Sequence, residues 1–290
     1  RNYLSVIFSV ARNQYPIKAV MKNGEKVLLK NNFDVFATAR GKRHLYEIES
    51  DQKLSVIHKA SNKKVILNYQ YNFGGPYSSF LSDAYKVENI DNKIVFDVGA
   101  YVCDSSIFFA LSGAKKVVSL EPLPQNYELA KKNIEVNNLT DKIDLFFAGL
   151  GRENEDIHVD PNVSSSPKVS LKKSSTGEKI RIFSLEKLLE MYDTNSAILK
   201  MNCEGCEYET ILNSSKDLLN KFEYIMMEFH YGCKNLKKKL ESCGFKVIVV
   251  DPVFCYNKFA ENHRMYIGKI FASKNNSINI ESVKQANLWE

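Results

Sequence analysis

The sequence predicts an α/β fold: a seven-stranded, mostly parallel, Rossmann-like sheet with a small β-rich N-terminal extension. Two observations support the sheet. Strand and helix patterns alternate through the last two thirds of the chain, which is typical of parallel strands joined by crossover helices. In addition, the apolar strand 94–98 leads through a turn at Gly99 into a helix near Asp104, and the next strand, 116–120, ends at Glu121. This arrangement is typical of the first βαβ unit of a nucleotide-binding sheet.

Residues 1–85 are predicted to form the N-terminal extension, with a leading helix and a linker. The apolar segment 3–10 is too short to span a bilayer, so we expect a helix that packs on the body of the protein. An Asn-Gly turn indicates a hairpin over residues 19–29. Further short strands are expected at 44–49, 54–58 and 64–68, followed by a Gly-Gly-Pro linker at 72–85 whose last residues, 77–85, would line the ligand pocket.

Residues 86–274 are predicted to form a cofactor-binding domain, and residues 275–290 a loose polar tail. A helix opens at Pro124, because proline fits the first turn of a helix. The polar segment 151–177 is long enough to be a lid or a binding loop. The other strands are expected at 141–148, 179–183, 197–201, 224–229, 246–250 and 265–272, with helices at 185–191, 207–212 and 236–243. Their order suits a sheet with one antiparallel strand.

Composition excludes several classes of protein. The net charge is +6, and the lysine clusters are scattered over separate elements, so no segment is typical of a nucleic-acid-binding tail. No segment approaches membrane-spanning length. Six cysteines are too few for a disulfide scaffold, so we expect free thiols and a cytoplasmic location. Cys203-Glu-Gly-Cys206 has the CxxC form, but neither a second CxxC nor paired histidines follow, and we expect no metal or redox role.

The turn after the first strand indicates which cofactor the sheet binds. Dinucleotide folds use Gly-x-Gly-x-x-Gly to close on a pyrophosphate, but here Gly99 stands alone. The carboxylate of Asp104 would repel a pyrophosphate and suits a positively charged ligand. S-adenosylmethionine carries a sulfonium and an ammonium, and Glu121 is placed to accept from its two ribose hydroxyls. The alternative is a buried turn in which Asp104 only caps the helix.

Four ordered motifs carry a resemblance to a known family. They are Asp97-Val-Gly-Ala followed by Asp104-Ser, Leu120-Glu-Pro122, Leu199-Lys-Met-Asn-Cys-Glu-Gly-Cys-Glu-Tyr208 and Met227-Glu-Phe-His230. Together they resemble the FkbM family of S-adenosylmethionine-dependent methyltransferases over roughly residues 70–250. The resemblance implies a class I methyltransferase fold and O-methylation of hydroxyls on sugars or natural products. The chain departs from the family at Cys103, where glycine is usual, and at Asn202, where aspartate is usual.

Ligands of such sheets bind beyond the carboxyl ends of the parallel strands. The residues expected to bind the cofactor are Asp97, Gly99, Ala100, Asp104, Ser105, Glu121, Pro122, Asn126, Ala148 and Gly149. The first five would surround the methionine part, and Ala148 and Gly149, at the end of the third strand, would flank adenine. Alternatively, Ala100 and Asn126 have only structural roles, Ala100 in packing and Asn126 as a helix cap.

The residues expected to act on the acceptor are Asn202, Glu204, Glu228 and His230, at the ends of the next two strands. Methyl transfer to an alcohol requires alignment of the acceptor with the methyl group and removal of the hydroxyl proton. The usual pKa of a histidine side chain is suited to this base, so His230 is the candidate. Glu228 or Glu204 would orient it. Alternatively, Glu204 is only an acid stabilised at the start of a helix. Asn202, Glu204 and Glu228 could in principle bind a divalent metal, but their spacing is not typical of a metal site, so no metal is predicted.

Three function classes remain open from the sequence. The favoured one is an O-methyltransferase that acts on a small molecule or a glycan. The second is an RNA methyltransferase, which the net positive charge and the β-rich extension suggest. A contiguous basic face beside the opening of the cofactor site would favour this class. The third is a protein that binds S-adenosylmethionine with altered catalysis, suggested by Cys103 and Asn202.

Overall fold

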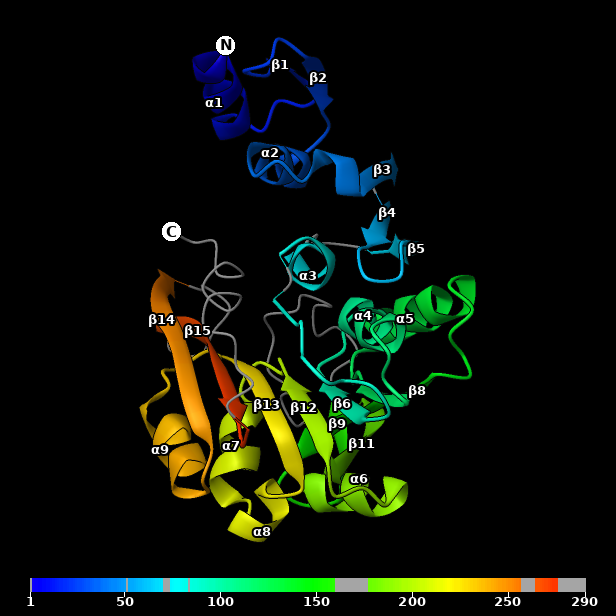
Figure 1. The fold of residues 1–290 in the computed structure, drawn as a ribbon, viewed down its shortest axis with the longest axis vertical. Coiled ribbons are helices and arrows are strands. Elements are labelled where there is room, and N and C mark those ends of the chain that lie inside the picture. Colours follow the sequence, from blue (N-terminus) through cyan, green and yellow to red (C-terminus); the bar gives the residue numbers. More distant parts are fainter. Residues whose placement is uncertain are drawn as a thin grey trace.

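The computed structural model describes residues 2–50, 52–69, 74–82, 84–159, 177–256 and 264–275. Its central element is a seven-stranded sheet with the order β14-β15-β13-β12-β6-β7-β8 (Figure 1). The strands are β6 (Ile94–Val98), β7 (Lys116–Leu120), β8 (Ile143–Phe146), β12 (Ala197–Met201), β13 (Phe222–Phe229), β14 (Lys246–Tyr256) and β15 (Arg264–Ser273). Only β15 runs antiparallel to its neighbours within this sheet. The predicted fold class, with one antiparallel strand, is confirmed.

Strand alternation divides the sheet's apolar side chains between two cores. Val95 and Ile198 face one core, which also contains α4 (Asp104–Leu111) and α5 (Pro124–Val136). Phe96 and Leu199, one residue along, face the other core with α6 (Leu185–Tyr192), α7 (Cys206–Asn213), α8 (Lys216–Leu219) and α9 (Lys234–Ser242). Because both faces are covered, the central strands read as continuous apolar runs rather than as alternating ones.

The expected third strand, 141–148, is in fact two strands in different sheets. β8 ends at Phe146, and β9 (Ala148–Gly151) pairs in parallel with β11 (Glu178–Ser184), which also pairs with β10 (Glu155–Val159). Ala148 and Gly149 therefore lie inside β9 and not at the end of the third strand of the main sheet. The sequence hides the break because both strands are apolar and only one residue separates them. Residues 160–176 of the predicted loop lie outside the described residues.

The N-terminal extension contains α1 (Tyr3–Ala11), the hairpin β1 (Ile17–Val20)–β2 (Lys26–Leu29), α2 (Asn32–Ala39), a helical turn at Arg43–Leu45, and a sheet of β3 (Tyr46–Ser50), β4 (Lys53–His58) and β5 (Lys63–Asn68). The leading helix and the hairpin form at the expected residues, but α1 packs on the hairpin in a small separate core rather than on the body of the protein. α2 was not expected; its N-cap Asn31 accepts from the backbone N–H of Asp34. The first strand of the sheet begins at Tyr46 rather than at residue 44, because the helical turn precedes it.

Amide side chains fasten the β3–β5 sheet to the main fold. Asn137, directly after α5, exchanges hydrogen bonds with the backbone of Ile66 at 2.9 and 2.7 Å, and Asn133 on α5 does the same with Asn68 at 2.7 and 2.9 Å. Leu54 and Val65 share one apolar cluster with Val95. The extension and the main sheet thus have a common core, and the division at residue 85 stays a prediction.

The linker between the two parts folds into two short helical segments, α3 (Gly74–Pro76) and η2 (Tyr77–Leu81). Residues 70–73 and 83 of the linker, and residues 276–290 of the expected tail, lie outside the described residues. Among the helices that are described, none combines the length and the apolar character needed to cross a membrane.

Gly99 is the residue that lets the ends of β6 and β12 approach each other. Its φ is +73°, and a Cβ built there would lie 1.9 Å from the carbonyl oxygen of Asn202. Both the conformation and the contact therefore require glycine. The N–H groups of Gly99 and Ala100 both donate to the carbonyl of Leu120 at 3.0 Å, which fixes the turn beside the end of β7.

We predict that Gly99→Ala destabilises the fold much more than a glycine substitution without a clash. The matched control is Gly41→Ala, which has a φ of +69° and no atom within 4 Å of its Cβ. Backbone strain alone costs about 1–2 kcal/mol at either position, and the clash at Gly99 adds roughly 1–3 kcal/mol or more. Urea unfolding of the two variants measures the difference. Equal losses of unfolding free energy would contradict the close approach of the two strand ends.

Candidate functional site

Asp97, the fourth residue of β6, is the centre of the carboxyl edge of the sheet. It is fully buried, and its Oδ2 accepts hydrogen bonds from the hydroxyls of Ser105 and Ser106 at 2.7 and 2.6 Å. Its Oδ1 forms an ion pair with Nζ of Lys200 at 2.8 Å. The structure thus brings Asp97 together with Ser105, as predicted, through the first turn of α4.

Lys200 was not predicted from the sequence. Its side chain is 4 % exposed, and besides Asp97 its Nζ donates to the carbonyl oxygen of Gly99 at 3.0 Å. Lys200 therefore ties β12 to both β6 and the glycine turn. The available signal was a single charge within the apolar strand 197–201, because a buried charge needs a partner.

Glu121, which follows β7, is buried and holds the neighbouring backbone in place. Its Oε2 accepts from the N–H of Tyr101 at 2.8 Å, and its Oε1 accepts from the N–H of Leu123 at 3.0 Å and from Nδ2 of Asn126 at 3.2 Å. Burial raises the pKa of Glu121 to about 7, against the lowering effect of these hydrogen bonds. A carboxylate has about four acceptor positions, so it retains capacity for a further donor. Pro122 lies partly buried between Glu121 and Leu123.

Asp104 begins α4 and is covered by the linker. It accepts a hydrogen bond from the hydroxyl of Ser79, and a Cβ on Gly75 would lie 2.8 Å from its Oδ1. Burial raises the pKa of Asp104 to about 6, although the hydrogen bond from Ser79 lowers it. The predicted approach of the linker to the site is thus present at Ser79 and Gly75.

Cys103 occupies a conformation that favours glycine. Its φ is +61°, in the left-handed region, and its side chain is fully buried, so the glycine usual in the family has a conformational explanation. The thiol interacts with the hydroxyls of Ser106 and Ser119, and burial raises its pKa. The side chain therefore packs beneath the turn.

Two buried acceptors at this edge have no hydrogen-bond partner among the described residues. They are Oδ1 of Asn126, on α5, and Oδ1 of Asn202, directly after β12. Buried acceptors are normally satisfied, so these two indicate a ligand that carries hydrogen-bond donors. S-adenosylmethionine carries hydroxyl, amino and ammonium donors. The residues present therefore fit that cofactor.

His230, at the end of β13, lies among three carboxylates. Its Nε2 is 3.2 Å from Oε2 of Glu204 and 3.6 Å from Oε1 of Glu228, and its Nδ1 is 3.9 Å from Oε1 of Glu207. Burial alone would lower the pKa of His230, but the hydrogen bonds to Glu204 and Glu228 and the nearby negative charges raise it to about 11. At neutral pH the ring is therefore an imidazolium. No group of side chains in the described residues is arranged to hold a metal ion.

Glu207 and a disulfide fix the loop that carries Glu204. The two carboxylate oxygens of Glu207 accept from the N–H groups of Cys203 and Gly205, both at 2.7 Å. Glu204 has a φ of +59°. Cys203 and Cys206 are joined by a disulfide, so the expectation that these cysteines are free thiols is wrong. Cys203 lies in the loop after β12 and Cys206 begins α7, and their Cα atoms are 5.5 Å apart, which the spacing alone did not indicate.

A further group of side chains lies around Glu228; sequence reasoning missed Lys269, whereas Tyr85 belongs to the segment 77–85 that was expected to line the pocket. Lys269 on β15 is opposite Glu228 in the strand register, and its Nζ lies 5.8 Å from the ring centroid of Tyr85. Nζ of Lys200 lies at the same distance from that ring. Tyr85, Glu228 and Lys269 line a small cavity together with Met226, Met227 and Phe271. Burial alone would raise the pKa of Glu228, but His230 and Lys269 hold it below its ordinary value.

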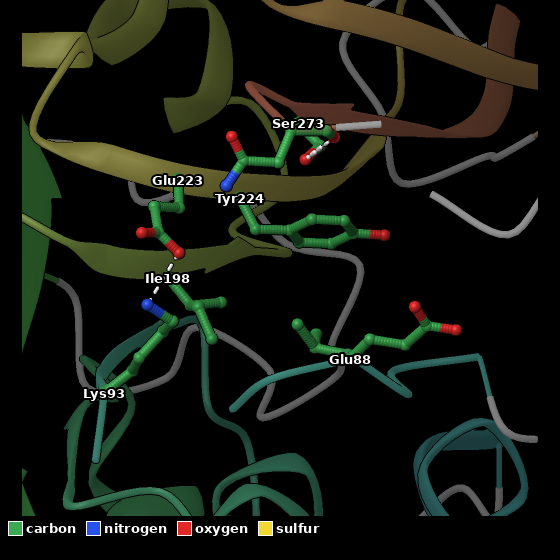
Figure 2. Close-up of a pocket in the computed structure, with 8 residues that line it drawn as sticks. Glu88, Lys93, Ile198, Glu223, Tyr224 and Ser273 are labelled. Carbon is green, nitrogen blue, oxygen red and sulfur yellow. Dashed lines mark hydrogen bonds and ion pairs between the residues drawn. The ribbon is translucent and has the colours of Figure 1, made fainter. Parts of the chain in front are cut away.

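Another pocket lies at the opposite edge of the sheet. Figure 2 shows it around Ile198, Glu223 and Tyr224, which are at the beginnings of β12 and β13. Lys93 closes one side through a 2.6 Å ion pair with Glu223. Since none of the predicted site residues lines this pocket, it is separate from the carboxyl-edge site. Of the predicted site residues, Ala148 and Gly149 belong to β9, which pairs with β11 in a separate sheet, and Ala148 packs in the same apolar cluster as Leu120 at the end of β7.

We predict that His230 stays protonated across the neutral range. With a folded pKa of about 11 and an ordinary value of 6.5, its charge stabilises the fold fully below pH 6.5, and this contribution is lost as the pH rises through 11. Nuclear magnetic resonance titration of the imidazole measures the pKa directly. Glu204→Gln combined with Glu228→Gln should lower it, whereas the exposed Glu209→Gln should not. A His230 that titrates near its ordinary value would contradict the cluster.

Comparisons with known proteins agree with this architecture. Residues 97–247 match the model of the methyltransferase FkbM domain, which is more than half of the chain. No curated protein matches the sequence.

Three solved structures are among those to which the chain is similar. The FkbM methyltransferase from Methylobacillus flagellatus KT is 13 % identical with a TM-score of 0.46, over 68 % of this chain and 47 % of that one. The METTL16 methyltransferase domain is 14 % identical with a TM-score of 0.46, over 94 % and 92 %. Precorrin-6y C5,15-methyltransferase from Geobacter metallireducens GS-15 is 14 % identical with a TM-score of 0.37, over 69 % and 88 %. The match over residues 97–247 shows that the chain belongs to the FkbM methyltransferase domain family.

Proposed function

We propose that the chain is an S-adenosylmethionine-dependent methyltransferase that methylates a hydroxyl of a small molecule or a glycan. The observation that carries the proposal is the juxtaposition of buried acids, Asp97, Asp104 and Glu121, with the two unpartnered amide oxygens of Asn126 and Asn202 at one edge of the sheet. Family membership supports methyl transfer. The acceptor class is the one that the resemblance to the FkbM family implies.

The cofactor-binding roles follow from the chemistry of each side chain. Glu121 would accept from the ribose hydroxyls, and Asp104 would face the ammonium group, whose charge favours the ionised carboxylate. The amide oxygens of Asn126 and Asn202 would accept hydrogen bonds from the remaining donor groups of the cofactor. Ala148 and Gly149, at the start of β9, would flank adenine. When bound, S-adenosylmethionine supplies an electrophilic methyl group on a positively charged sulfur.

The acidic cluster around His230 supports a changed assignment of the catalytic roles. An imidazolium already holds its proton at neutral pH, so His230 would position the carboxylates rather than act as the base. Glu228 is partly exposed, ionised and lines the cavity beside Lys269, so it would take the proton from the acceptor hydroxyl. Glu204 would orient His230 from the other side.

The charges at the carboxyl edge disfavour an RNA acceptor. Glu204, Glu207 and Glu228 surround His230, and the cationic groups found at this edge among the described residues, Lys200 and Lys269, are buried or partly buried. RNA-binding surfaces present contiguous basic side chains to the phosphates. A cytoplasmic location stays a prediction, and the disulfide between Cys203 and Cys206 removes part of its support, because disulfides are rare in reducing compartments.

We predict that Glu121→Gln weakens binding of S-adenosylmethionine by roughly 2–3 kcal/mol, because a neutral amide replaces a charged acceptor of two hydroxyls. Isothermal titration calorimetry measures the affinity, and Glu128→Gln, an exposed acid on α5, is the matched control. Unchanged affinity in Glu121→Gln would place the ribose elsewhere. Binding of NAD as tightly as the methyl donor would overturn the cofactor assignment.

We predict that Glu228→Gln lowers turnover roughly 10²–10⁴-fold while the affinity for S-adenosylmethionine stays close to that of the wild type, because the acceptor proton loses its base. Turnover is followed as a mass increase of about 14 Da, dependent on the methyl donor, in a mixture of candidate glycans and RNAs. If Glu228→Gln is fully active and His230→Asn is not, the histidine is the base after all. If wild type binds the cofactor but methylates nothing in the mixture, the altered-catalysis alternative is favoured.

A further inference from the structure

Glu228 on β13 and Lys269 on β15 carry opposite charges at directly opposite positions of the antiparallel register. Residues in such positions point to the same face of a sheet and normally bring their side chains into contact. Here both side chains line the same small cavity. Among the described residues, Glu228 forms an ion pair with His230 at 3.6 Å, and none is formed between Glu228 and Lys269. The two charges therefore border the cavity rather than each other.

The ammonium group of Lys269 has no polar partner within the part of the chain that the structure describes. Its contacts there are the charges of Glu228 and Lys200 and the ring of Tyr85, whose centroid lies 5.8 Å from Nζ. The side chain is partly buried, and burial, together with the like charge of Lys200, lowers the pKa of Lys269. Because an ammonium carries three donors and is costly to bury without acceptors, this one indicates a ligand that supplies an oxygen.

Tyr85 places the cavity beside the proposed cofactor site. Its ring centroid lies 5.8 Å from Nζ of Lys200 and at the same distance from Nζ of Lys269. Burial raises the pKa of the Tyr85 hydroxyl, and nearby carboxylates, among them those of Asp104 and Asp97, raise it further. The ring is thus within electrostatic reach of the acids of the cofactor site as well as of the cavity. An acceptor in the cavity would lie next to a ligand bound at these acids.

We propose that Lys269 is a catalytic residue, which binds the acceptor oxygen opposite Glu228 and stabilises negative charge on it. The inference rests on the proposed function. The acceptor hydroxyl accepts a hydrogen bond from Nζ of Lys269 and donates one to the carboxylate of Glu228. In the transfer, the hydroxyl proton passes to Glu228, the oxygen bonds to the methyl carbon, and the carbon–sulfur bond breaks with its electron pair moving to sulfur. A fixed ammonium beside the oxygen is most effective as the proton leaves, because negative charge develops there.

Steady-state kinetics of Lys269→Met test the proposal, with the acceptor that the wild type converts to a product heavier by about 14 Da as the probe. We expect kcat to fall roughly 10²–10³-fold, while the affinity for S-adenosylmethionine and the thermal midpoint stay close to those of the wild type. Lys269→Arg keeps a cation and should recover part of kcat. The matched control is Lys238→Met, an exposed lysine on α9, which should leave kcat unchanged.

The pH dependence separates this role from that of a counter-ion. If Lys269 only keeps Glu228 ionised, raising the pH to about 8 restores kcat in Lys269→Met, since carboxylates are then ionised, and the proposal is overturned. If Lys269 stabilises the acceptor oxygen, the loss persists at that pH. The proposal alone is overturned if Lys269→Met turns over as the wild type does while Glu228→Gln does not. If the wild type yields no heavier product, the proposed function fails, and the role of Lys269 fails with it.

Discussion

The buried ion pair between Lys200 and Asp97 is the interaction on which the rest of the carboxyl edge depends. Both side chains are almost completely buried, so neither charge could persist there without the other. The same Nζ holds the carbonyl of Gly99, while the second oxygen of Asp97 holds the first turn of α4 through Ser105 and Ser106. One charged pair therefore sets the relative position of β6, β12, the glycine turn and the helix that follows it.

The acids around this pair explain why the edge is suited to a cationic ligand. Asp104 and Glu121 are buried, and burial raises their pKa values to about 6 and about 7. A ligand with a positive charge and hydroxyl donors would complete the balance. Beside this group, the three carboxylates around His230 hold a second positive charge. In the proposed function, the first cluster binds the cofactor and the second faces the acceptor.

The sequence was sufficient for the parts that depend on local pattern. The apolar run before Gly99, the acid after the second strand and the alternation of strands and helices each have a short-range cause, and the sheet confirmed them. The features that were missed depend on partners distant in sequence. Lys200 is understandable only once Asp97 is beside it, and the high pKa of His230 depends on carboxylates from α7 and its preceding loop. Similarly, the break between β8 and β9 follows from pairing with β11, which is remote in the chain.

Hydrogen–deuterium exchange with and without S-adenosylmethionine tests the central claim most directly, namely that the methyl donor binds at the edge organised by Lys200 and Asp97. Amide exchange slows where a ligand stabilises the backbone against local opening. The account predicts slower exchange in residues 97–105 and 121–126, where the turn amides pack against Asp97 and Glu121, and unchanged exchange in α1 and the β1–β2 hairpin. Unchanged exchange over 97–105 and 121–126 at a saturating concentration of the methyl donor would contradict it.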